Sequence, residues 1–145
     1  MIKAAYGIIC FQTSDCPHMT IENEDDIKML RMAQVSPDGK KLIYEALGKL
    51  WIKSLPNGKV SRLTQTKGDL RELFPQWSRD GKYLVYTTWD DNNQGSVKLL
   101  RLRDDKTTTL TKEPGKYVEP TFSPDGNNIV FRKIKGGNIT PPTWS

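Results

Sequence analysis

Three side chains near the N-terminus have the chemistry of metal ligands. Cys10, Cys16 and His18 follow the pattern Cys-x5-Cys-x-His, and thiolate and imidazole groups are common zinc ligands. A structural zinc site needs four ligands, and its cysteines usually stand closer together. Because His18 is the only histidine, we interpret it as an ordinary loop residue and expect no metal. The cysteines either pair in an oxidising compartment or remain free thiols, and the sequence leaves both open.

A second set of candidates is an aspartate that recurs inside the motif Ser-(Pro/Arg)-Asp-Gly. The copies are Ser36-Pro37-Asp38-Gly39, Ser78-Arg79-Asp80-Gly81 and Ser123-Pro124-Asp125-Gly126. In a type I turn the first central position favours proline, aspartate can bond nearby backbone N–H groups, and glycine accepts the left-handed conformation. The turn therefore explains why the aspartates recur. We expect them at matching places on separate repeats, not together as a catalytic pair.

The third set surrounds an oxygen-rich tip, where Trp89 is followed by Asp90-Asp91-Asn92-Asn93. The spacing is not that of a calcium loop, in which alternate residues are ligands, so we interpret the stretch as a solvated hairpin tip. The indole beside it is the tryptophan we expect to be exposed, whereas Trp77 and Trp144 stand where the repeat needs core bulk. Trp89, Asp90 and Asp91 are thus our candidate interaction surface.

Motifs for catalysis are missing from the sequence. It contains no Gly-x-Ser-x-Gly elbow and no glycine-rich phosphate loop, and one histidine cannot build a multi-histidine metal centre. We therefore predict no catalytic residues, no cofactor and no enzymatic activity in this chain. The net charge of +5 over 145 residues is modest and mixed in sign, so we expect neither a nucleic-acid partner nor a membrane partner.

Strand-like runs flank each turn and predict an all-β fold. Short segments rich in β-branched and aromatic residues follow each turn, and further hairpin signals such as Asn57-Gly58, a pair that readily adopts positive φ, come after them. Four antiparallel strands in about forty residues make one propeller blade. We assign blades to residues 29–64 and 74–111 and an incomplete blade to 119–145, after a non-repeat segment at 1–28 with one or two strands.

The whole repeat, x-Pro-x-(Phe/Trp)-Ser-Pro-Asp-Gly-Lys-x-(Ile/Leu)-x-(Tyr/Phe) followed by Leu-Thr, resembles the TolB-like propeller repeat, a relative of WD-type repeats. The likeness covers roughly 29–131. Within the family, segments such as Thr87-Thr88-Trp89-Asp90-Asp91 look like the propeller before the catalytic barrel of large amidohydrolase-like proteins. TolB-like propellers also precede peptidase domains, and in TolB itself they form a periplasmic protein-binding platform.

The resemblance implies a ring of about six or seven blades, whereas this chain holds about two and a half. The lead-in Pro141-Pro142-Thr143-Trp144-Ser145 even suggests the start of a fourth blade. We interpret the chain as a non-catalytic partial propeller, a scaffold or protein-interaction module that is a fragment of, or derived from, a larger hydrolase. The alternative is an accessory propeller of an amidohydrolase- or peptidase-type enzyme whose catalytic domain is absent from this chain; a weaker idea is small-ligand binding in the channel.

Unpaired strand edges also predict a partner. Exposed edges invite pairing with another chain, so we expect protein partners and self-association into a homo-oligomer through the open blades. The N-terminal strand is a candidate to complete the truncated blade of a neighbour. The family resemblance implies a periplasmic or secreted protein, whereas a natural start at Met1 without a signal peptide implies a cytoplasmic one.

Overall fold

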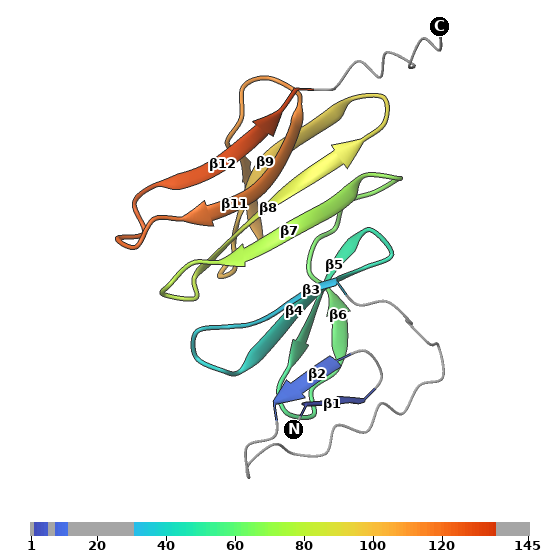
Figure 1. The fold of residues 1–145 in the computed structure, drawn as a ribbon, viewed down its shortest axis with the longest axis vertical. Coiled ribbons are helices and arrows are strands. Elements are labelled where there is room, and N and C mark those ends of the chain that lie inside the picture. Colours follow the sequence, from blue (N-terminus) through green and yellow to red (C-terminus); the bar gives the residue numbers. More distant parts are fainter. Residues whose placement is uncertain (1, 6–7, 12–30, 136–145) are drawn as a thin grey trace, which may run out of the picture.

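The computed structural model describes the backbone strands at 2–5 and 8–11 and the whole of residues 31–135 (Figure 1). This part consists of strands and turns, and it holds no helix long and apolar enough to cross a membrane. The predicted all-β fold class is therefore confirmed. Predictions for Cys16, His18 and the lead-in at 141–145 lie outside the described residues, and of Cys10 only the backbone is described.

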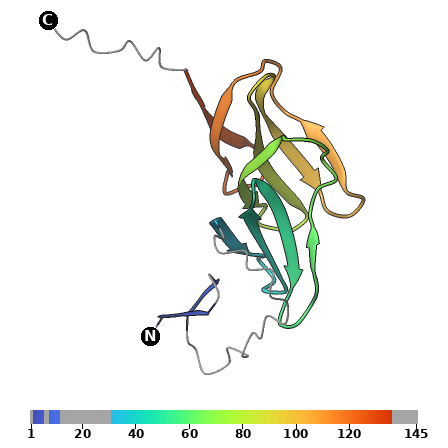
Figure 2. The ribbon, with the colours of Figure 1, turned by 90° about the vertical axis from the view of Figure 1, so that its right-hand side faces the viewer.

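The strands form separate antiparallel sheets that stand side by side (Figures 1 and 2). Blade 1 consists of β3 (Arg31–Val35), β4 (Lys41–Ala46), β5 (Lys49–Ser54) and β6 (Val60–Arg62). Blade 2 consists of β7 (Arg71–Trp77), β8 (Tyr83–Asp90), β9 (Gln94–Arg101) and β10 (Lys106–Thr109). In the part of the chain up to residue 135, half-blade 3 has β11 (Lys116–Phe122) and β12 (Ile129–Ile134), and β1 (Ile2–Ala5) pairs with β2 (Ile8–Phe11) in a separate hairpin. In each blade the strands pair in chain order, so the structure is a partial propeller of two four-stranded blades and one truncated blade.

Each Ser-x-Asp-Gly turn closes its first hairpin through one repeated set of contacts. In blade 2 the Ser78 hydroxyl donates to Asp80 Oδ1 at 2.6 Å, and the same carboxylate accepts the Lys82 N–H at 3.0 Å. The serine oxygen in turn accepts the Tyr83 N–H at 2.9 Å. Gly81 takes φ 69°, as the turn requires. The turns at Asp38 and Asp125 repeat this arrangement, so serine contributes as much as the aspartate and glycine emphasised by the sequence pattern.

A β-bulge recurs four residues before each of these serines. The pairing of β7 with β8 shifts between Leu73 and Gln76, and Phe74 inside the shift has φ 54°. The corresponding residues of β3 and β11, Met32 and Glu119, have φ 51° and 53°. In a regular strand, side chains an odd number of positions apart point to opposite faces. The extra residue at the bulge reverses this alternation, so Glu72 and Trp77 both face blade 1.

The core lies between the sheets. One cluster joins blade 1 to blade 2, and it contains Ile43, Leu50, Leu63, Leu84, Tyr86 and Leu100. A second cluster joins blade 2 to half-blade 3 and contains Val85, Val97 and Tyr117, with Leu99, Phe122, Ile129 and Phe131 packed against it. A third cluster, of Leu42, Tyr44 and Ala46 with Trp51 and Leu55 packed against them, lies within blade 1. Burying such side chains contributes about 1.5–3 kcal/mol each, so the two clusters between the sheets hold the sheets in place.

Two local predictions were wrong. The turn at 56–58 does not use positive φ at Asn57 or Gly58. Instead the Gly58 N–H donates to the Ser54 carbonyl at 2.8 Å, and a Cβ at this glycine would lie 2.5 Å from the Ser54 side chain, so close approach is what requires the glycine. The hairpin tip predicted around Asp90-Asp91-Asn92-Asn93 is shorter than expected, because Trp89 and Asp90 still belong to β8 and pair with Gly95 and Gln94.

Candidate functional site

The two ends of the blades differ, and one of them carries a groove. The turn end carries the three Ser-x-Asp-Gly turns. The opposite end, which we call the tip end, carries the β4–β5 and β8–β9 turns together with the starts of β3, β7 and β11. There a groove of about 870 Å³ runs across all three sheets. Because it spans several elements, only the packed sheets can form it.

Cations stand at the start of each inner strand along this groove. Arg31, Arg71 and Lys116 are the first residues of β3, β7 and β11, and all three line the groove. Arg31 lies opposite Glu45 in the β3–β4 register. Among residues 31–135 no ion pair is formed by Arg31 or Lys116, so both remain available to a ligand.

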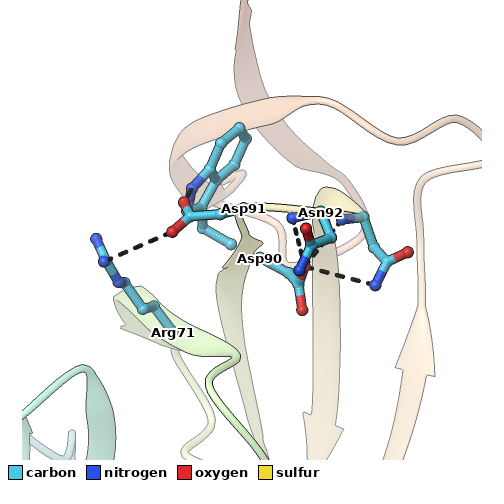
Figure 3. Close-up of polar contacts among 6 residues, drawn as sticks. Arg71, Asp90, Asp91 and Asn92 are labelled. Atoms are coloured by element: carbon cyan, nitrogen blue, oxygen red, sulfur yellow. Dashed lines mark hydrogen bonds and ion pairs between the residues drawn. The ribbon is translucent and has the colours of Figure 1, made fainter.

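The β8–β9 tip forms one wall of the groove (Figure 3). Asp90 Oδ1 accepts the backbone N–H groups of Asn92 and Asn93, each at 2.8 Å. These hydrogen bonds lower the pKa of Asp90, because they stabilise the charged carboxylate. This carboxylate therefore shapes the tip through Oδ1.

Asp91 is held between an indole and a guanidinium. Trp89 Nε1 donates to Asp91 Oδ1 at 2.8 Å, and Arg71 Nη2 lies 4.0 Å from Asp91 Oδ2. Figure 3 shows Arg71 reaching from β7 toward this carboxylate. Both charged side chains are largely exposed, so the pair is weak and easily exchanged. The three residues singled out from the sequence, Trp89, Asp90 and Asp91, thus lie together on the groove wall, and their role in binding stays a prediction.

Beside the groove, a buried carboxylate ties blade 1 to blade 2. Glu72 is fully buried and accepts the Leu50 N–H at 2.9 Å through Oε2. Its Oε1 accepts the hydroxyls of Thr64 and Thr66, and its own N–H donates to the Gly48 carbonyl at 2.8 Å. A buried charge is tolerable only with such partners, so Glu72 fixes the crossover between the blades.

The same crossover is anchored at the groove by Lys49. Its ammonium donates to the Gly68 carbonyl at 2.9 Å and the Leu70 carbonyl at 2.6 Å.

Two titratable groups near the groove have raised pKa values. Burial raises the pKa of Glu45, and the charge of Arg31 partly offsets this rise. Burial also raises the pKa of Tyr86, beneath the crossover, to about 12, and the charge of Glu72 adds to the effect.

These groups are suited to recognition. Within residues 31–135 no cluster of three or more His, Cys, Asp or Glu side chains could hold a metal ion. The turn aspartates lie at the other end of the blades, and each is held by its own serine, so no catalytic carboxylate pair arises from them. What the groove offers is an indole, cationic donors and a shape set by three blades.

Sequence reasoning missed Glu72, Arg71 and Lys116. The two cations carry a weak signal, since each opens an inner strand 45 residues from the other. Glu72 has no such signal, because its counterpart in half-blade 3 is Tyr117. Its role depends on Thr64 and Thr66, which the chain brings to it only through the crossover.

Comparisons with known proteins agree with this fold. No protein-family model matches the chain. The Tol-Pal system protein TolB of Francisella tularensis subsp. holarctica (strain OSU18) is 39% identical over 96 residues, which cover 65% of this chain and 22% of that protein. The Tricorn protease homolog of Saccharolobus solfataricus is 28% identical over 107 residues, 73% of this chain and 10% of that protein. The chain therefore spans about a fifth or less of the length of these curated relatives.

A solved structure shows the same architecture. The crystal structure of TolB from Acinetobacter baumannii superposes with a TM-score of 0.62 at 24% identity and covers 75% of this chain and 28% of that one. Together with the recurring turns, this likeness shows that the described blades have a β-propeller fold that resembles TolB. The more specific link to amidohydrolase-like proteins is a separate matter that neither relative carries.

Proposed function

We propose that these TolB-like propeller blades form a non-catalytic protein-interaction module whose binding surface is the groove at the tip end. The observation that carries this proposal is the arrangement of the groove, in which Trp89 and three inner-strand cations face one hollow that spans all the blades. Aromatic and arginine side chains are enriched where proteins bind one another. Trp89, Asp90 and Asp91 are the proposed contact residues on one wall.

The partner segment that fits this groove is acidic. Basic and acidic lining residues are equal in number, four of each, so net charge does not decide the matter. We choose an acidic partner because Arg31 and Lys116 have no ion pair in the described region, whereas Asp90 Oδ1 and Asp91 Oδ1 already accept hydrogen bonds from the tip itself. Carboxylates of the partner segment would form charge-assisted hydrogen bonds with these two cations.

Peptide titration tests the proposal. We expect a glutamate-rich peptide to bind the chain at low salt in isothermal titration calorimetry and to bind more weakly as salt rises. Lys116→Gln and Arg71→Gln should each weaken binding by roughly five-fold or more, which corresponds to about 1 kcal/mol. The matched control is Lys106→Gln, because Lys106 is exposed on β10 at the outer edge of blade 2.

Two outcomes would contradict this function. A lysine-rich peptide that binds as tightly as the glutamate-rich one would exclude recognition through the cations. Equal weakening by Lys106→Gln and Lys116→Gln would show that binding follows overall charge and does not use the groove.

A second function deserves a test because of the likeness to the Tricorn protease homolog. In this alternative the blades are an accessory propeller of an amidohydrolase- or peptidase-type enzyme, and the groove guides substrate toward a catalytic domain outside this chain. Sequencing the flanking DNA would decide, since a continuous reading frame with a His-x-His metal motif or a nucleophile elbow would support it. The proposed descent from a larger hydrolase depends on the same result.

The name of the first relatives suggests where to look for a partner. They are proteins of a Tol-Pal system, so we propose a protein partner of that kind and a periplasmic location for this chain. A reporter enzyme that works only outside the cytoplasm can be fused to the chain in its native gene context. We expect this fusion to be active. Self-association through the open blades is a separate proposal with a different surface.

A further inference from the structure

Within residues 31–135, half-blade 3 has two strands fewer than either of the other blades. In blades 1 and 2 the strands corresponding to β12, which are β4 and β8, pair along their whole length with β5 and β9. Among the described residues β12 pairs only with β11. Its outer edge therefore presents unpaired backbone N–H and C=O groups, which readily accept another strand.

The sheet face beside this edge is also uncovered. Val130 occupies the place in half-blade 3 that Ile43 and Val85 occupy in blades 1 and 2. Those two residues are 0% exposed because the next blade packs on them, whereas Val130 is 62% exposed. Ile134, four residues further along β12 and on the same face, is also exposed, at 39%. The described residues thus provide neither a strand beside β12 nor a layer over its outer face.

The N-terminal hairpin has the opposite deficiency. β1 and β2 form a two-stranded sheet on their own, and an isolated two-stranded hairpin is marginally stable in water. Two strands from the hairpin and two from half-blade 3 would make one four-stranded blade, the number seen in blades 1 and 2.

The polarity of the hairpin strands matches the two vacant positions. Third strands are apolar toward both neighbours, as Val97 and Leu100 of β9 are buried on opposite faces. β2, with the sequence Ile-Ile-Cys-Phe, is apolar on both faces as well. Outermost strands are more polar, as in the fully exposed β10, and β1 contains the only charged residue of the hairpin strands, Lys3.

Within one molecule the two parts are far apart. Figures 1 and 2 place the β1–β2 hairpin and β12 at opposite ends of the long axis. A neighbouring copy can bring its hairpin to β12 without that displacement. We infer that the β1–β2 hairpin of a second copy completes half-blade 3, with β2 pairing beside β12 and β1 outside it. The surface involved is separate from the groove.

Light scattering during size-exclusion chromatography tests this inference directly. The intact chain should have a mass at least twice its 16.5 kDa, since each copy both gives and accepts a hairpin. Ile9→Lys places a charge in the strand that becomes buried, and we expect it to yield a monomer with unchanged circular dichroism. Thr108→Lys, on the exposed strand β10, is the matched control and should leave the mass unchanged.

A peptide experiment separates exchange from general stickiness. A chain that lacks residues 1–11 should be monomeric and should bind a synthetic peptide of residues 1–12 at one peptide per chain, whereas a scrambled peptide should not bind. A monomeric intact chain, or an oligomer unaffected by Ile9→Lys, would overturn the inference. Lys116→Gln, which weakens the groove, should leave the mass unchanged, so the failure of one proposal does not imply failure of the other.

Discussion

The turn end and the tip end of the blades are built in opposite ways. At the turn end, the same serine, aspartate and glycine contacts appear three times, once in each sheet. At the tip end, the blades share only a cation at the start of each inner strand, and the crossover beside the groove is held by one buried carboxylate, Glu72, that has no counterpart in half-blade 3. The repeated turns distribute stability over three equivalent sites. The Glu72 network concentrates stability in one place, so the surrounding surface of the tip end can differ between blades.

The largest effect is expected from removing the unique support. Glu72→Ala would leave the Leu50 N–H and two threonine hydroxyls without an acceptor in a buried place, and we expect it to lower the free energy of unfolding by about 3–4 kcal/mol. Urea unfolding followed by circular dichroism measures this. The control is Glu113→Ala, whose exposed pair with Lys133 contributes about 0–1 kcal/mol. A loss below 1 kcal/mol in Glu72→Ala would mean that the tip end is not held at one point.

A smaller effect is expected at any single turn. Asp80→Ala removes the acceptor for the Ser78 hydroxyl and the Lys82 N–H, and we expect a loss of about 1–2 kcal/mol. Asp38→Ala should cost a similar amount, because the serine of its turn is equally buried, while Asp125→Ala should cost less at the more exposed turn of half-blade 3. The same urea experiment ranks the three. If one turn alone carried most of the loss, stability would not be distributed.

The smallest effect concerns protonation at the turns. Hydrogen bonds from Ser78 and then from the Lys82 N–H lower the pKa of Asp80, so its carboxylate contributes stability above the unfolded pKa near 4, and this contribution is lost as pH falls through the folded pKa. Ser78→Ala should move the pKa of Asp80 upward, as measured by NMR titration of the side-chain carboxyl. An unchanged pKa would show that the serine hydroxyl is not the main cause of the shift.

The turn end was predictable from sequence because its contacts are local. Serine, aspartate and glycine lie within four residues of one another, so their chemistry can be inferred without knowing the fold, and their spacing gave the blade period. The tip end was only partly predictable. Trp89, Asp90 and Asp91 are adjacent in sequence and were found. Arg71 lies beside Trp89 because β7 pairs with β8 in the same sheet, and Lys116 lines the same groove only because half-blade 3 packs beside blade 2. The Asn57–Gly58 turn was mispredicted because contact with Ser54 constrains that glycine more than φ does.

The bulge in each inner strand has a consequence for how such blades can change. Because the extra residue at Phe74 shifts the alternation of side chains between the two faces, the two halves of β7 alternate independently of each other. Trp77 determines the packing of the half near the turn, and Arg71 and Glu72 determine the contacts of the half near the groove. Substitutions in the groove-side half would therefore not shift the side chains of the turn-side half, and Trp77 would keep its packing against blade 1.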